Sequence, residues 1–93
     1  MFEILYHYLV VRGDIPRLLK LWREKIRAAI ENRLVTKPDL YGKPLRRSLK
    51  GYRKLRVGDY RIIFKIDGRK VKILIIQHRS VIYSDVKKRK FNF

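Results

Sequence analysis

Three basic side chains are spaced so that they could bind one anion together. Lys54 and Arg56 alternate with apolar residues in a β-rich run, and Arg61 lies in the next run, beyond the turn Gly58-Asp59. Antiparallel pairing across such a two-residue turn makes Arg56 and Arg61 neighbours on one face of a sheet. Like charges on adjacent strands repel each other, so this spacing favours a face that binds a polyanion.

A second group of polar side chains follows the last β-rich run, in the segment QHRSVIYS at residues 77–84. From this segment His78, Arg79 and Tyr83 can reach the same surface. An imidazole can act as an acid or a base near neutral pH, a guanidinium binds phosphate, and a phenol ring stacks on nucleobases. The structural alternative for His78 is a hydrogen bond at the end of its strand.

The composition also favours a polyanionic partner. The chain has 93 residues, enough for one packed core, and its 25 Lys and Arg against 8 Asp and Glu give a formal net charge of +17. Such a protein attracts nucleic acid first, and an anionic membrane surface or an acidic protein second. The absence of cysteine excludes disulfides and thiolate zinc sites. No secretory signal or apolar run of about 18 residues occurs, so a cytoplasmic location is expected.

The first half of the chain is expected to form a strand and a helical hairpin. Alternating residues predict a strand over residues 2–8, and Asp14 can be the N-cap of the helical segment. A break near residues 20–23 is expected because the segment is about twice the usual helix length. Residues 36–39 end it, and residues 41–50 read as a loop. The apolar positions with helical spacing are Ile15, Leu18, Leu19, Trp22, Ile26, Ala29, Ile30 and Leu34.

The second half is expected to form an antiparallel meander of three strands over residues 52–57, 60–66 and 71–77. Together these elements predict a single α+β domain over residues 1–93, with helices on one sheet face and the other face free. The basic tail at residues 84–93 is compatible with a short helix, a pairing strand or disorder. The apolar side chains expected to face the helices are Leu55, Val57, Tyr60, Ile62, Phe64 and Ile66.

The segment GKPLRRSLKGYRKLRVGDYRIIF, followed by IIQHRSVIY, resembles the second half of RelE/ParE toxins. The order of the predicted elements agrees with that family, and its most specific motifs are LRVGDYR and HR-x-x-x-Y. The resemblance implies a compact RelE-like fold and an acidic antitoxin that wraps the toxin. It also implies one of two activities. The RelE branch cleaves messenger RNA in the ribosomal A site, whereas the ParE branch poisons DNA gyrase.

The resemblance assigns catalytic positions of the RelE branch to five residues, which are Lys54, Arg56, Arg61, Arg79 and Tyr83. One departure concerns the second strand, where the nuclease has two lysines flanking an apolar residue and this chain has Arg53 and Lys54 side by side. His78 is an addition relative to that nuclease. The general base is therefore either Lys54 or His78.

Metal-free RNA cleavage requires a base for the 2′-hydroxyl, positive charge at the phosphorane and an acid for the 5′-oxygen. Neighbouring arginines disfavour the charged form of Lys54, which suits a base. Arg61 is expected to clamp phosphate, Arg79 to stabilise developing charge, and Tyr83 to stack on a base or orient the 2′-hydroxyl. Further RNA contacts are expected from Arg46, Arg47, Lys50, Arg53 and Lys65.

Three functions remain open at this point. The favoured one is a toxin that cleaves ribosome-bound mRNA without a metal or other cofactor, paired with an acidic antitoxin and with no membrane partner. The alternatives are a non-catalytic, ParE-like inhibitor of gyrase and a degenerate toxin that binds only its antitoxin. The free toxin is expected to be a monomer.

Overall fold

A computed structural model describes residues 1–89, which form one five-stranded sheet with the order β1-β5-β4-β3-β2. The strands are β1 (Glu3–Tyr6), β2 (Lys43–Pro44), β3 (Arg53–Val57), β4 (Tyr60–Asp67) and β5 (Lys70–His78). The first strand pairs with β5 in parallel, and all other neighbours are antiparallel. The predicted α+β order of strand, helical hairpin and meander is therefore confirmed.

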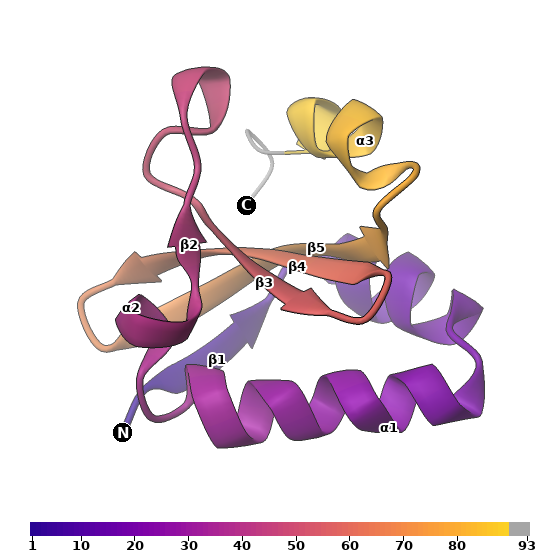
Figure 1. Cartoon of the computed structure of the whole chain (residues 1–93), viewed down its shortest axis with the longest axis horizontal. Coiled ribbons are helices and arrows are strands. Elements are labelled where there is room, and N and C mark those ends of the chain that lie inside the picture. Colours follow the sequence, from indigo (N-terminus) through magenta and orange to yellow (C-terminus); the bar gives the residue numbers. More distant parts are fainter. Residues whose placement is uncertain (90–93) are drawn as a thin grey trace.

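The larger of two buried apolar clusters lies between one face of the sheet and the helices that cover this face (Figure 1). The predicted inward side chains Leu55, Ile62 and Phe64 are buried there, with Val57 and Tyr60 packed against them. The helical elements are η1 (Val10–Asp14), η2 (Ile15–Arg17), α1 (Lys20–Ala29), η3 (Ile30–Leu34), α2 (Pro38–Tyr41), η4 (Arg47–Leu49) and α3 (Ile82–Arg89). The prediction of which strand residues face the helices is correct.

The expectation that the opposite face is free was wrong in part. A second buried cluster lies on that face, where α3 and the loop around η4 cover Ile63, Leu74 and Ile75. The register shifts between Ile63 and Phe64, so two consecutive residues of β5 join the same cluster. Strict alternation in the sequence cannot reveal such a bulge. On this face Arg56 of β3 and Lys65 of β4 remain exposed.

The helical hairpin is present, but its break lies earlier than predicted. Leu18 and Leu19 are extended, with ψ of 138° and 150°, and α1 begins directly after them at Lys20. No glycine or proline marks the position of this break in the sequence. The length of the segment alone therefore placed the break too late. The expected loop at residues 41–50 also contains the short strand β2 and the turn η4.

Asp14 stands at the predicted N-cap position, before η2, but its side chain makes no capping hydrogen bond, because its carboxylate is used in tertiary contacts. It is 4% exposed and accepts hydrogen bonds from the backbone N–H of Ile76 at 2.9 Å and from Nε2 of Gln77 at 3.2 Å. The guanidinium of Arg89 donates to both carboxylate oxygens, at 2.5 and 3.2 Å. This ion pair fastens the end of α3 to η1, and the other hydrogen bonds of Asp14 fasten η1 to β5. The rest of the predicted tail, residues 90–93, lies outside the described residues.

Candidate functional site

A hollow of about 460 Å³ lies between the sheet and α3, at the end of the molecule where the β3–β4 turn and the end of β5 meet. Its lining brings together most of the predicted catalytic side chains from four separate elements. The described residues that line it are Lys54, Arg61, His78, Arg79, Ser80 and Tyr83. Four of these six carry a positive charge or an ionisable nitrogen, so the hollow is suited to an anion.

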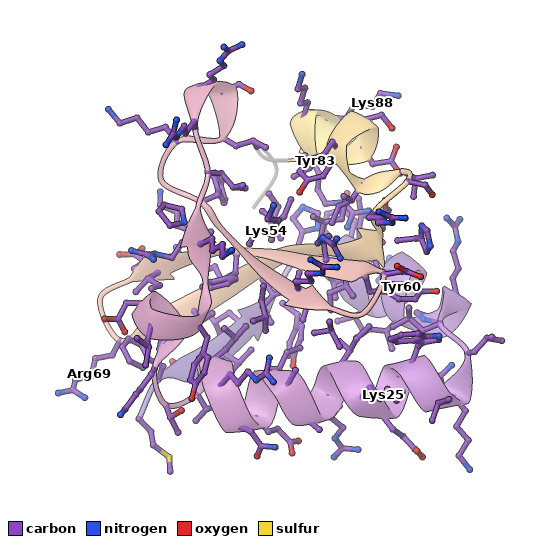
Figure 2. The ribbon with its side chains drawn as sticks, viewed as in Figure 1. Lys25, Lys54, Tyr60, Arg69, Tyr83 and Lys88 are labelled. Atoms are coloured by element: carbon purple, nitrogen blue, oxygen red, sulfur yellow. The ribbon has the colours of Figure 1, made fainter. Side chains whose placement is uncertain are left out.

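Lys54 and Tyr83 meet across this hollow. Lys54 projects from β3 toward α3, and its Nζ lies 5.9 Å from the centroid of the Tyr83 ring (Figure 2). An ammonium group at this distance over an aromatic face is held by a cation–π interaction. Tyr83 is 39% exposed, so its ring is also open to a ligand. The two groups thus lie close enough to contact one nucleotide.

Arg61 is the most rigidly held cation of the hollow. It is only 8% exposed, and its Nη1 donates to the carbonyl oxygens of Gly58 at 2.9 Å and Tyr60 at 3.0 Å. Both acceptors belong to the β3–β4 turn and its first following residue, so the turn fixes the guanidinium. A positive charge fixed in advance can stabilise a transition state without reorganising.

His78 has its tautomer set by Ser80. The backbone N–H of Ser80 donates to Nδ1 of His78 at 3.1 Å, and the Ser80 hydroxyl lies 2.8 Å from the same nitrogen. Because Nδ1 accepts, the neutral ring carries its proton on Nε2. The ring also meets Tyr60 edge to face, with centroids 5.5 Å apart. His78 therefore makes the structural hydrogen bond that the sequence suggested as its alternative role. Its Nε2 is in addition a hydrogen-bond donor.

Arg79 is held at the rim of the hollow by the β3–β4 turn. Its backbone N–H donates to the carbonyl of Asp59 at 2.8 Å, and its Nε lies 3.6 Å from an Asp59 carboxylate oxygen. Both side chains are more than half exposed, so the pair is a loose surface ion pair. The guanidinium is consequently free to exchange its partner for a phosphate.

Arg56 lies beside Lys54 and Arg61 but outside the hollow described above. It is the register partner of Arg61, as predicted, and its side chain is exposed. Together with Lys54 and Arg61 it lines a separate hollow of about 220 Å³. The predicted catalytic residues thus border two hollows that share Lys54 and Arg61.

Comparison with known proteins identifies the family. Residues 2–83 match the family described as ParE toxin of type II toxin-antitoxin system, parDE. The chain is also 35% identical over 83 residues to a Mycobacterium tuberculosis protein called Toxin RelE, covering 83% of this chain and 86% of that protein. This chain belongs to the RelE/ParE superfamily of type II toxins.

Solved structures agree with this assignment. The toxin–antitoxin complex RelBE2 of Mycobacterium tuberculosis contains a chain with a TM-score of 0.78 and 30% identity, and the match covers 84% of this toxin and 98% of that chain. The RelB–RelE complex of Methanococcus jannaschii gives a TM-score of 0.69 at 23% identity, covering 87% and 96% of the two chains. The second likeness supports the fold alone.

Among the predicted RNA-binding residues of the toxin, Arg53 and Lys65 make contacts with other residues of the toxin itself. Nη1 of Arg53 donates to the carbonyls of Asp39 at 3.1 Å and Gly42 at 2.8 Å, which holds the end of α2. Nζ of Lys65 lies 5.9 Å from the centroid of the Tyr52 ring. Neither is among the described residues that line the two hollows. The other three, on the exposed loop around η4, are Arg46, Arg47 and Lys50.

Sequence reasoning missed four residues that border the hollows of the toxin. Ser80 follows His78 directly, and its role in fixing the imidazole becomes visible only from the geometry. Lys43 lies opposite Lys54 because β2 pairs with β3, a pairing of only two residues that the sequence does not signal. Arg33 and Tyr41 come from η3 and α2 and complete the smaller hollow.

Among the described residues, no helix of the toxin is long and apolar enough to cross a membrane.

Proposed function

We propose that this toxin is a metal-independent endoribonuclease that cleaves ribosome-bound messenger RNA by attack of a 2′-hydroxyl on the adjacent phosphate. The observation that carries the proposal is that Lys54, Arg61, Arg79 and Tyr83 line one hollow. These are residue types that can supply a base, two phosphate contacts and a stacking ring. The resemblance to the RelE branch assigns catalytic positions to the same residues.

The first step is removal of the 2′-hydroxyl proton. Lys54 is the proposed base because it is half-buried, lines the same hollow as Arg61 and has its Nζ 5.9 Å from the centroid of the Tyr83 ring. The 2′-oxygen then attacks phosphorus, and the P–O5′ bond breaks to leave a 2′,3′-cyclic phosphate. The negative charge that develops on the phosphorane is stabilised by Arg61, whose orientation is fixed by two carbonyls, and by Arg79 at the rim.

The second requirement is a proton for the departing 5′-oxygen. His78 is the proposed acid: as the imidazolium it donates its Nε2 proton to the 5′-oxygen, which leaves a neutral ring whose Nδ1 accepts from the backbone N–H of Ser80. The sequence left the roles of acid and of base open for His78, and the proposal assigns it the acid. Tyr83 is proposed to stack on the nucleobase beside the scissile phosphate, since its ring is 39% exposed.

The test is cleavage of a message on programmed ribosomes by wild type and Arg61→Ala. Loss of one preorganised donor is expected to lower the cleavage rate by about 100- to 1000-fold, whereas ribosome binding changes far less because other cations remain. Arg69→Ala is the matched control, since Arg69 is exposed on the distant β4–β5 turn (Figure 2). Urea unfolding of both variants separates lost catalysis from lost folding.

A ParE-like inhibitor of DNA gyrase is the second candidate, favoured by the family match to ParE toxins. It predicts a different outcome of the same experiment. Wild-type toxin would arrest growth and block supercoiling by gyrase without cutting message, and Arg61→Ala and Tyr83→Ala would remain fully toxic. A toxin that neither cuts message nor arrests growth would be the degenerate form that binds only an antitoxin.

We also propose that an acidic antitoxin covers the cationic face, by which we mean the surface around the two hollows with Lys54, Arg56, Arg61 and Arg79. The similar chains of Mycobacterium tuberculosis and Methanococcus jannaschii were solved in complexes with antitoxins. A formal charge of +17 on this chain calls for opposite charge in its partner. A cytoplasmic location and a monomeric free toxin remain predictions.

A further inference from the structure

The smaller hollow, of about 220 Å³, lies at the edge of the sheet beyond the proposed cleavage site. It is formed by η3, α2, β2 and β3, and none of the described residues that line it is acidic. The cations that line it are Arg33, Lys43, Lys54, Arg56 and Arg61. So many cations around one small space repel each other, and an anion in the space removes that repulsion.

The pairing of the strands keeps these charges close together. Lys43 lies directly opposite Lys54 across β2 and β3, and Arg56 lies directly opposite Arg61 across β3 and β4. Directly paired residues share a sheet face, with Cβ atoms about 4.5–5.5 Å apart. The pair of Lys43 with Lys54 and the pair of Arg56 with Arg61 therefore lie next to each other on one face of the sheet.

The two hollows share a wall, because Lys54 and Arg61 line both of them. A ligand with one anionic group can occupy either hollow. A ligand with several anionic groups in a row, such as a nucleic-acid strand, can occupy both at once. The charge of the next hollow shows in which direction such a strand continues.

On the opposite side of His78 lies a hollow of about 300 Å³, and its lining includes Asp14 and Asp85 together with Arg17. Because Asp14 is paired with Arg89, and Arg17 is offset by Asp85, this hollow has no excess of positive charge, and a strand leaving the cleavage site gains less in that direction. It is favoured toward Lys43 and Arg33. The two neighbouring hollows thus differ in charge and give the strand one path.

Tyr41 adds an aromatic surface to the basic hollow. The Arg33 guanidinium carbon lies 5.6 Å from the centroid of the Tyr41 ring, and Tyr41 is still 44% exposed. An open aromatic ring among cations is the device by which proteins bind single-stranded nucleic acid, with bases on the ring and phosphates on the cations. An acidic peptide would use the cations and gain nothing specific from the ring.

From these observations we infer that the basic hollow is a second RNA subsite, which binds the phosphate of a nucleotide adjoining the scissile one and stacks its base on Tyr41. The inference rests on the proposed nuclease function, because that function supplies the RNA. Lys43, Arg33 and Arg56 hold the phosphate, while Lys54 and Arg61 bridge the two subsites. The subsite adds affinity for longer strands and takes no part in bond cleavage.

The test uses fluorescence anisotropy with 2′-O-methyl RNA, which the toxin cannot cleave, as a dinucleotide and as a hexanucleotide. Tyr41→Ala is expected to weaken hexanucleotide binding by about 5- to 150-fold, the range for loss of one stacked base, and Tyr41→Phe should retain it. Lys43→Ala should flatten the slope of log K against log salt for the hexanucleotide by about 0.7, the value for one contact to a single strand. Both variants should change dinucleotide binding much less, because the single phosphate of a dinucleotide can still bind in the hollow of the cleavage site.

Lys70→Ala and Arg69→Ala are the matched controls, since both residues are exposed and lie outside the two hollows. Unchanged hexanucleotide affinity in both Tyr41→Ala and Lys43→Ala would overturn the subsite, while cleavage that still depends on Arg61 would leave the nuclease proposal standing. If the two variants weaken only the antitoxin complex, the hollow is an antitoxin contact and the inference is wrong. A wild-type toxin that cleaves no RNA would instead remove the proposed function.

Discussion

The indole ring of Trp22 on α1 lies directly against Gly58 in the β3–β4 turn. A Cβ atom at Gly58 would lie 2.4 Å from Cη2 and 2.7 Å from Cζ3 of Trp22, and Gly58 has a φ of 59°. The same indole contacts Tyr60 with ring centroids 5.1 Å apart, and Tyr60 meets His78 at 5.5 Å. A row of rings thus connects the helical face to the proposed cleavage site.

Gly58→Ala is expected to destabilise the toxin more than Gly68→Ala. Both glycines have left-handed backbone, with φ of 59° and 61°, so each substitution carries a backbone penalty of about 1–2 kcal/mol. Only Gly58 adds a clash, because nothing lies within 4 Å of a Cβ at Gly68. Urea unfolding measures both. Equal losses of unfolding free energy would show that Trp22 moves aside without cost.

Arg89→Ala is expected to lower the free energy of unfolding by about 3–5 kcal/mol, because it leaves the buried carboxylate of Asp14 without its charge partner. The neighbouring exposed variant Lys88→Ala is the control and should stay within about 0.5 kcal/mol of wild type. Since α3 also carries Tyr83, the cleavage rate should fall in Arg89→Ala. Full activity and stability in that variant would mean that the helix is held by its apolar contacts alone.

The assignment of base and acid predicts two distinct changes in the pH dependence of cleavage. A lysine base works when neutral, so the rate of wild type should rise with pH, and Lys54→Ala should flatten this rising limb. An imidazole acts as the acid only as the imidazolium, so His78→Ala should alter the limb at which the rate falls with rising pH. Single-turnover rates between about pH 5 and 10 provide the measurement. A rising limb lost in His78→Ala and kept in Lys54→Ala would exchange the two roles.

Much of the site could be predicted because it depends on strand alternation and one tight turn. The pairing of Arg56 with Arg61 follows from the two-residue turn between their strands, and the order HR-x-x-x-Y carries Arg79 and Tyr83 past the end of β5. The local sequence sets both features. They were therefore visible without any tertiary information.

The remaining features depend on contacts between distant parts of the chain. The ion pair of Asp14 with Arg89 joins residues 75 apart, and the short pairing that places Lys43 opposite Lys54 has no apolar pattern of its own. Trp22 shares the helical spacing of the core residues but is half-buried against the turn, because only the approach of Gly58 decides where the ring lies. A local pattern cannot specify such distant contacts.

The antitoxin is predicted to cover the cationic face of the toxin and not its helical side. If an acidic segment binds the cationic face, the association constant should fall as salt rises, because ions screen attraction between exposed charges. Arg56→Glu should weaken binding and reduce the salt dependence, since Arg56 is exposed beside the two hollows. Leu21→Ser on α1 is the contrasting variant, because Leu21 is 60% exposed on the helical side. Calorimetric titration with the cognate antitoxin measures binding to the wild type and to the two variants. Tight binding that ignores salt and Arg56→Glu but is lost in Leu21→Ser would place the antitoxin on the helices and leave the cationic face open in the complex.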